Sequence, residues 1–404
     1  MARNGAPARA GVIQTPHGRI ETPTFVVVGT HATVKCLGPD DLRAAKVQVV
    51  LSNGYHLLRR AVMIDAAGGL AKFNGWLGPT MTDSGGFQVM SLGSGLGKIV
   101  SMDQKDVAIT EREARKSERL ALVDDDGVEF RDPWNGRIVK FTPEMSVRTQ
   151  HLIGADMMMA FDELTNISDS YEYNVEALER TRLWAKRSLS EHVRQTNLRG
   201  ERPYQALFGV LQGAHYRDLR EKAAHDLAAM RIDGVEFDGF GLGGAFEKER
   251  LGEIIEWMTR ILPENKPRHL LGLSKPDDIF IGVENGCDTF DCVAPTREAR
   301  HGRVYTLDGD LNLRRSEFKD DARPLDAKCD CPACLDGCTR AELRAGLKSK
   351  ITEEKDLTLS RLSGHNVRFM TRLMEQIRAA IIDGTFAELK NCWLKRYYDG
   401  TIES

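Results

Sequence analysis

The sequence predicts an α/β fold in which eight parallel strands close into a (β/α)8 barrel of the TIM type. Short apolar runs rich in β-branched residues alternate with amphipathic stretches of helical period, eight times along the 404 residues. Neither a phosphate-binding P-loop nor a dinucleotide-binding glycine fingerprint is present in the sequence to favour an open sheet. A doubly wound open sheet is therefore the alternative fold.

The expected elements begin with a hairpin, in which residues 11–13 and 19–20 flank the turn-forming Thr15-Pro16-His17-Gly18. The barrel strands are expected in the apolar runs at residues 25–28, 47–51, 79–82, 157–160, 207–211, 239–242, 269–271 and 289–290. Helices are expected between them at residues 144–153, 175–192, 217–230, 248–261 and 277–285. The first of these has Thr142 as its N-cap and Pro143 in its first turn.

Composition indicates a cytoplasmic protein without a membrane partner. Hydrophobic residues make up 41% and charged residues 28%, which is typical of a soluble globular chain with a large core. No apolar run approaches the roughly 18 residues of a membrane span, and residues 1–10 lack the apolar core of a signal peptide. The formal net charge of −3 gives no global sign of a polyanionic partner, so a nucleic-acid surface would require local segregation of charge.

One charged insertion, residues 93–132, interrupts the regular spacing. We expect a long loop over the catalytic face, with a hairpin around Asp126-Gly127. A solvated insertion without a catalytic role and a lid over the site are the two interpretations of this segment.

Polar residues or glycines follow six of the apolar runs: Asn53, Asp83, Asp162, Gln212, the Gly243-Gly244 pair and Asp291. In barrels of this type the chemistry lies at the C-terminal ends of the strands, so these residues predict a pocket for a hydrogen-bonding heterocycle. An Asp at a strand end can be a nucleophile, and the arginines that follow can hold phosphates or base edges (Arg297, Arg300 and Arg303). The basic residues of the C-terminal helices are typical of solvated faces, although they could also form a phosphate platform (Arg340, Arg344, Lys348, Lys350, Arg368 and Arg372).

A cysteine cluster predicts a metal site. Cys329, Cys331 and Cys334 are too closely spaced for unstrained disulfides, so they either share a metal or are reduced and idle. The fourth ligand is either Cys338 or His365, which follows Ser363-Gly364 at what we interpret as the start of a helix. Four protein ligands would make a closed, structural zinc site.

The motif Phe290-Asp291-Cys292-Val293, followed by Pro295-Thr296-Arg297, closely resembles that of the tRNA-guanine transglycosylases, as do residues 82–88 and the Cys-x-Cys-x-x-Cys cluster. These enzymes exchange a guanine in an anticodon for a 7-deazaguanine base. Further family motifs occur in family order at residues 52–57, 161–163, 211–213, 243–244 and 274–278. The resemblance thus covers nearly the whole chain.

The resemblance implies a role for each site residue. Asp291 would be the nucleophile and Asp83 the general acid/base; Asp162, Gln212 and Gly244 would bind the base, with Asn53 and Ser84 in support; Arg297, Arg300 and Lys275 would bind tRNA. It favours Cys329, Cys331, Cys334 and His365 as the ligands of one structural zinc per subunit, in a zinc-binding subdomain at residues 303–383 attached to a single barrel domain of residues 1–404. It also suggests a homodimer.

The incoming base is expected to be queuine rather than 7-aminomethyl-7-deazaguanine. The segment after Gly243-Gly244 is shorter than in common bacterial members, Leu164 replaces a frequent cysteine, and Arg300-His301-Gly302 resembles members that salvage queuine. Three alternatives remain: a relative that acts on DNA, a non-catalytic tRNA-binding partner subunit, and a glycoside hydrolase on the same barrel.

Overall fold

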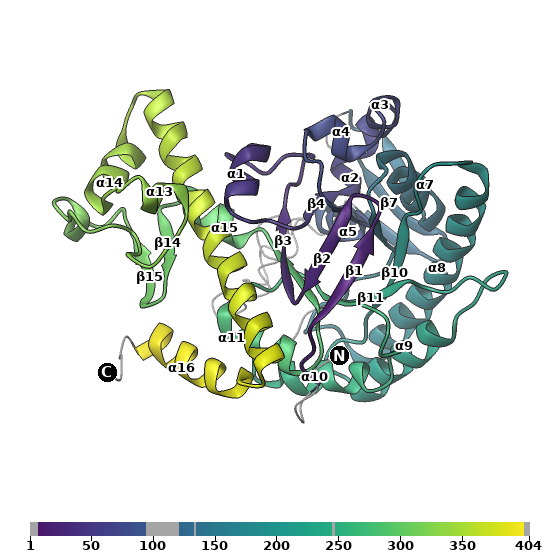
Figure 1. Cartoon of the computed structure of the whole chain (residues 1–404). Helices are drawn as coiled ribbons and strands as arrows, with labels where there is room; N and C mark the ends of the chain where they lie inside the picture. Colours follow the sequence, from purple (N-terminus) through teal and green to yellow (C-terminus); the bar gives the residue numbers. More distant parts are fainter. Residues whose placement is uncertain (1–6, 94–120, 133–134, 245–246, 400–404) are drawn as a thin grey trace, which may run out of the picture. The chain divides into compact units, whose positions relative to one another are not determined.

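The computed structural model describes residues 7–93, 121–132, 135–244 and 247–399 (Figure 1). Most of the charged insertion and the residues directly after Gly244 therefore lie outside the described residues. None of the described helices combines the length and the apolar character needed to cross a membrane.

Eight parallel strands close into a barrel, and its strand order follows the chain. The strands are β3 (Thr24–Val28), β4 (Val50–Asn53), β5 (Thr80–Asp83), β9 (Met157–Met159), β10 (Ala206–Leu211), β11 (Gly239–Leu242), β12 (Arg268–Leu270) and β13 (Thr289–Cys292). The predicted (β/α)8 barrel is confirmed, and the doubly wound alternative is wrong. β13 returns to pair with β3, which leaves no open edge.

Three strands, β4, β5 and β13, extend further at their C-terminal ends than their apolar residues predict. Asp83 is the last residue of β5, and Asp291 lies inside β13, where it pairs with Val26 of β3. The ladder thus fixes the backbone of Asp291, and Asp83 ends its strand, whereas the sequence places both aspartates just beyond the strands. A site built on strands is positioned more rigidly than one built on loops.

Contacts group the chain into two compact units, one of which comprises residues 52–73 and 79–271. Its helices are α2 (Gly54–Leu57), α3 (Ala61–Ala66), α4 (Leu70–Asn74), α5 (Gly86–Gly93), α7 (Pro143–Ile153), α8 (Tyr171–Leu198), α9 (Arg217–Ala229) and α10 (Leu251–Thr259). Thr142 caps α7 as expected, because its hydroxyl accepts from the backbone N–H of Met145. α8 begins earlier than its apolar pattern predicts, because Ser170 caps it by accepting from the N–H of Tyr173.

The described end of the charged insertion belongs to a small antiparallel sheet in the same unit. β6 (Ala121–Asp124), β7 (Gly127–Arg131) and β8 (Ile138–Phe141) form it, and β6 and β7 make a hairpin where the sequence predicts one. Val128, Phe130 and Phe141 pack with Phe161 and Trp184 in one buried cluster. This part of the insertion is therefore packed structure and not a solvated loop.

The other unit comprises residues 1–51, 74–78 and 272–404. It contains the β1–β2 hairpin (Gly11–Thr15 and Gly18–Thr22), the hairpin of β14 (Arg303–Thr306) and β15 (Gly309–Asn312), and the helices α1 (Pro39–Ala44), α11 (Pro276–Glu284), α12 (Ala294–Arg300), α13 (Pro332–Leu335), α14 (Arg340–Lys348), α15 (Thr352–Asp383) and α16 (Phe386–Asp399). The 32-residue α15 packs against α12, α13 and α14. It is the long yellow-green helix in Figure 1.

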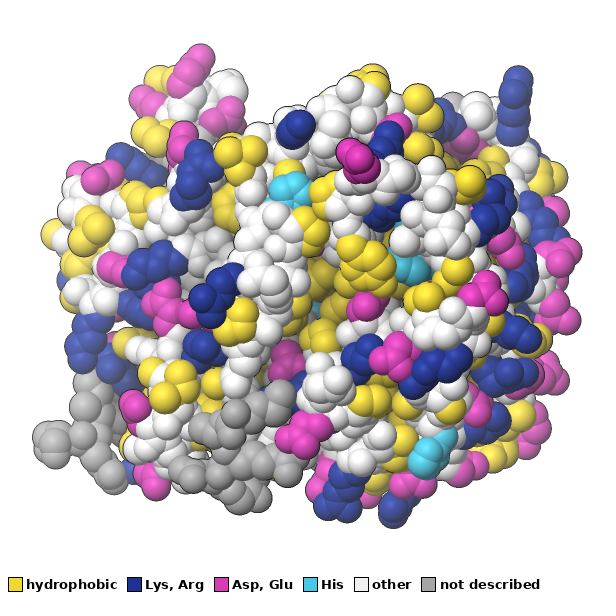
Figure 2. Space-filling model, turned by 45° about the vertical axis from the view of Figure 1, so that its right-hand side comes forward, with side chains coloured by type: hydrophobic (Ala, Val, Ile, Leu, Met, Phe, Trp, Pro, Cys, Tyr) yellow, Lys and Arg dark blue, Asp and Glu magenta, His cyan; other side chains and the backbone are white. Residues whose placement is uncertain are grey.

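Charge on the surface is mixed. Figure 2 shows Lys and Arg side chains interspersed with Asp and Glu on the face that it displays. Along α8 the intermixing reflects ion pairs such as Arg187–Glu144 and Arg194–Glu191. A charge count alone therefore identifies no nucleic-acid surface, in agreement with the net charge.

Candidate active site and metal centre

Three donors hold the carboxylate of Asp83 at the end of β5. The side-chain amide of Asn53 donates to Oδ2 over 2.7 Å, while the backbone N–H groups of Gly54 and Gly85 donate to Oδ1 over 2.9 and 3.1 Å. The carboxylate is the acceptor in all three hydrogen bonds. Its position is thereby fixed before any ligand binds.

Asn53 and Gly54 can do this because β4 runs directly into α2. The Oδ1 atom of Asn53 caps α2 by accepting from the N–H of His56 over 2.9 Å, which leaves its NH2 group to donate to Asp83. A Cβ on Gly54 would lie 2.7 Å from the backbone oxygen of Asp83. Only glycine permits this close approach of the two strand ends.

Asp162, beyond the end of β9, is linked to two neighbouring strand ends. Gln212 Nε2 donates to its Oδ2 over 2.7 Å, and the hydroxyl of Ser84 lies 3.4 Å from its Oδ1. Burial raises the pKa of Asp162 to about 6, although the hydrogen bonds from Gln212 and Ser84 oppose the rise. At neutral pH this side chain is an ionised acceptor that lacks the full solvation of an exposed carboxylate.

Gln212 carries an acceptor without a partner. Its Oε1 atom is buried and has no hydrogen-bond partner among the described residues. Gly244 lies beside it with φ +104°, and an added Cβ would stand 2.9 Å from this oxygen and 2.8 Å from Nη2 of Arg220. A buried unmet acceptor of this kind is typical of a place where a ligand N–H donates.

Arg220 is a residue of this region that the sequence interpretation missed. Its guanidinium is fully buried and donates over 2.7 Å to the backbone oxygens of Gly243 and Ala214, and burial lowers its pKa to about 9. It therefore holds the glycine pair in place. A signal was available, because Arg220, Ala224 and Leu227 share the buried face of α9 at i, i+4 and i+7.

Asp291 lies on β13 and is oriented by a backbone donor just after β12. The N–H of Gly272 donates to its Oδ1 over 3.0 Å, and the side chain is partly exposed. Lys275 is exposed directly before α11, where it occupies the N-cap position. The structure therefore gives the carboxylate a fixed direction and leaves the lysine accessible to solvent.

The three arginines after Asp291 differ in their surroundings. Arg297 on α12 is exposed, whereas Arg300 is half-buried, and burial together with the charge of Arg297 lowers its pKa. Arg303 forms an ion pair with Asp310, with an Nη2 to Oδ2 distance of 2.6 Å. Arg297 is thus the more accessible contact for a phosphate or a base, and Arg303 is committed to its own hairpin.

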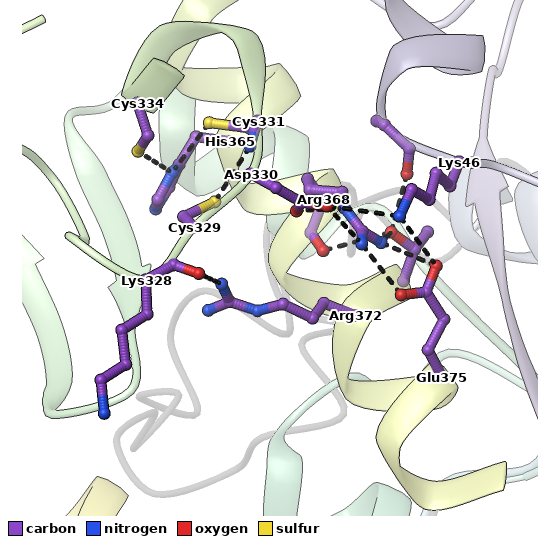
Figure 3. Close-up of polar contacts among 12 residues, drawn as sticks. Lys46, Lys328, Cys329, Asp330, Cys331, Cys334, His365, Arg368, Arg372 and Glu375 are labelled. Carbon is purple, nitrogen blue, oxygen red and sulfur yellow. Dashed lines mark hydrogen bonds and ion pairs between the residues drawn. The ribbon is translucent and has the colours of Figure 1, made fainter. Parts of the chain in front are cut away.

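A metal-type cluster is present in the same unit as Asp291. Ligand atoms of Cys329, Cys331, Cys334 and His365 all lie within 4.8 Å of one another (Figure 3). The Sγ atoms of Cys331 and Cys334 are each 3.4 Å from Nδ1 of His365. Tetrahedral zinc bonds of the usual lengths place sulfur and nitrogen ligands about 3.5 Å apart, so the cluster could hold such an ion.

The hydrogen bond of the second ring nitrogen of His365 fixes the tautomer that a metal ligand needs. Nε2 of His365 lies 2.8 Å from the backbone oxygen of Tyr305, to which it donates, and this leaves Nδ1 as an acceptor facing the cysteines. The expectation that His365 starts a helix is wrong, because it lies well inside α15 and is completely buried. Cys338 lies outside the cluster and packs instead with Leu343 and Leu362.

The chain is similar over nearly its whole length to known proteins of one family. The family described as queuine tRNA-ribosyltransferase matches residues 4–399. The queuine tRNA-ribosyltransferase of Symbiobacterium thermophilum is 39% identical over 401 residues, which cover 98% of this chain and 90% of that protein. That of Halothermothrix orenii is 40% identical over 392 residues, 96% of this chain and 94% of the relative. A putative queuine tRNA-ribosyltransferase of Archaeoglobus fulgidus is 40% identical over 407 residues, 96% of each.

Proposed function

Because the chain belongs to the queuine tRNA-ribosyltransferase family, we propose that it exchanges the guanine at the wobble position of a tRNA anticodon for a free 7-deazaguanine base. The enzyme is then a pentosyltransferase of queuosine modification. The observation that carries the proposal is Asp291, a carboxylate built into a barrel strand and aimed by the N–H of Gly272.

Asp291 is the proposed nucleophile. One of its carboxylate oxygens attacks the anomeric carbon of the ribose, the bond from that carbon to guanine N9 breaks, and the departing base takes up a proton. The incoming base then loses its N9 proton and displaces the aspartate from the same carbon. Two displacements retain the configuration of the sugar, as in retaining glycosidases.

Asp83 is the proposed general acid/base that serves the departing and the incoming base. Its contacts with Asn53, Gly54 and Gly85 support this role, because a proton carrier must be held within hydrogen-bond reach of the atom it serves. Asn53 acts through Asp83 and is therefore a positioning residue. Ser84 has the same relation to Asp162.

Asp162, Gln212 and Gly244 are proposed to bind the base. A purine-like ring presents N–H donors along one edge, which suit the carboxylate of Asp162 and the buried Oε1 of Gln212. The backbone at Gly244 offers a further hydrogen bond at a position where a side chain does not fit. The base must leave its stack to reach them, which costs least in a single-stranded anticodon loop.

The tRNA is proposed to contact Arg297, Arg300 and Lys275, and the exposure of Arg297 and Lys275 supports this.

One structural zinc per chain would be held by Cys329, Cys331, Cys334 and His365 and would stabilise the subdomain of residues 303–383. With four protein ligands the ion would stabilise the fold and take no part in the exchange. A cytoplasmic homodimer is the proposed state of the protein.

Queuine is the proposed incoming base. The support is the short segment after Gly244 and the presence of Leu164, both where the substituent of the 7-deaza ring would project. Residues 245–246 of that segment lie outside the described residues. A shorter segment at this side of the base pocket would leave room for the cyclopentenediol group of queuine, which the aminomethyl base lacks.

The test uses wild type and Asp291→Asn with tRNA, a free base and a denaturing gel. The wild type should exchange labelled guanine and form a protein–RNA band, whereas Asp291→Asn should lose both and still bind tRNA. A band that persists in Asp291→Asn would refute the nucleophile. A parallel assay offers labelled guanine to tRNA and to duplex DNA, and exchange into the DNA would indicate the DNA-acting alternative. A wild-type protein that exchanges guanine into neither substrate would indicate a non-catalytic subunit.

A further inference from the structure

Asp330 lies between two cysteines of the metal cluster, and its side chain is held by a neighbouring arginine (Figure 3). Its carboxylate accepts from Arg368 through two parallel hydrogen bonds, Nε to Oδ1 over 2.7 Å and Nη2 to Oδ2 over 2.9 Å. Arg368 is one turn beyond His365 on α15. The loop that carries the cysteines and the helix that carries the histidine are therefore joined by a second link beside the cluster.

Arg368 is itself held in one position. It is 2% exposed and makes a second two-bond contact with Glu375, both distances being 2.9 Å. It also donates to the hydroxyl of Thr371 over 3.0 Å. A guanidinium shared by two carboxylates in fixed geometry is a rigid anchor, because its planar donors match both acids at once.

Contacts on either side extend this anchor. Lys46 Nζ lies 3.3 Å from Asp330 and 4.0 Å from Glu375. Both carboxylates therefore pair with Lys46 as well as with Arg368. On the next turn of α15, Arg372 donates to the backbone oxygen of Lys328 and to Asp326. The segment before and within the cysteine motif is thus attached to one face of α15 at positions i, i+3 and i+7 from His365.

From these contacts we infer that Asp330 and Arg368 are a positioning pair that holds the cysteine loop at the distance from His365 that the metal requires. A loop fixed in advance loses less freedom when the ion binds, and contacts that hold the loop against the helix oppose the separation of Cys329 and Cys331 from His365. The pair should therefore slow metal release. The inference rests on the proposed metal site, and neither residue is among its proposed ligands.

Asp330→Asn and Asp336→Asn form a matched test. Each change removes one carboxylate within two residues of a cysteine ligand, but Asp336 is 60% exposed and its ion pair with Arg361 spans 3.8 Å. The purified, metal-loaded full-length proteins are mixed with an excess of a chromogenic zinc chelator at constant pH. We expect release from Asp330→Asn roughly tenfold faster than from wild type, and release from Asp336→Asn within about twofold of wild type.

Arg368→Lys is the second variant, because it keeps the charge and loses the paired geometry. It should also release zinc faster, with unchanged far-UV circular dichroism, since Asp330 is 43% exposed and Glu375 remains to pair with the lysine. Release from Asp330→Asn as slow as from Asp336→Asn would overturn the inference. Equal acceleration in both would also overturn it, by showing a general effect of charge. Wild type purified without metal would refute the metal site as well.

Discussion

Replacing Asp162 by Asn should make the protein more stable at neutral pH while abolishing its activity. The isosteric amide can still accept from Gln212 and can donate to the hydroxyl of Ser84, so both hydrogen bonds survive. What disappears is an ionised carboxylate in a partly buried, incompletely solvated position. The rise of its pKa from 3.8 to about 6 corresponds to about 3 kcal/mol of folding free energy, as an order of magnitude.

The sign of the pH dependence follows from proton binding. Between about pH 4 and pH 6 the folded protein keeps this proton while the unfolded chain has lost it, so the wild type loses stability as the pH rises through this window. Below about pH 4 both states are protonated and the ionisation has no cost. Asp162→Asn has no such group, so its advantage should be close to zero near pH 4 and approach 3 kcal/mol at pH 8.

Urea unfolding of the two proteins at several pH values between 4.5 and 8 measures the difference. Glu163→Gln is the control, because Glu163 is 1% exposed but is paired with Arg180 and accepts from the hydroxyl of Tyr173. Its removal should destabilise the protein, since Arg180 loses its buried partner. An Asp162→Asn protein that is no more stable than wild type at pH 8, or whose advantage does not change with pH, would refute the reasoning.

Three further predictions concern the metal, the tRNA and the incoming base. His365→Ala should lose bound zinc and Cys338→Ala should keep it, as measured by metal analysis of the purified proteins; the reverse result would exchange the fourth ligand. Arg297→Ala should weaken tRNA binding about tenfold and make the dependence of affinity on salt concentration shallower. Arg303→Ala should change tRNA affinity little, because Asp310 already pairs with its guanidinium. Equal losses of affinity in the two variants would refute this distinction. The kcat/KM for displacement of guanine should favour queuine over 7-aminomethyl-7-deazaguanine, and a tenfold preference for the aminomethyl base would overturn the proposal for the base alone.

The barrel and its strand ends could be predicted because both depend on local pattern. An apolar run followed by a polar residue identifies a strand end without knowledge of its partner, so the sequence locates the strand ends at Asn53, Asp83 and Gln212 to within about two residues. The position of His365 could not be found in this way. Ser363-Gly364 is typical of a helix start, yet the buried Leu362 and Val367 continue the apolar face of α15 through it, and packing overrode local preference.

The buried arginines were missed for a different reason. Arg368 stands among charged residues that are typical of a solvated helix face, but it is enclosed by Asp330 and Glu375 from other turns and segments. Arg220 likewise binds backbone oxygens that no sequence pattern brings together. The helical spacing of Arg220 with Ala224 and Leu227 could have indicated its burial, but the partners of both arginines are supplied only by the folded chain and have no local signature.

The attachment of α15 to the start of the chain has a consequence for the order of synthesis. Arg378 near the end of this helix donates to the backbone oxygens of Gly11 and Thr22 in the β1–β2 hairpin, across 367 and 356 residues. A ribosome makes that hairpin more than 350 residues before Arg378, so the hairpin lacks this contact until α15 has emerged. The cysteine loop likewise meets His365 only after α15 has been made. The β1–β2 hairpin thus gains its contact with α15 only after most of the barrel strands have been made.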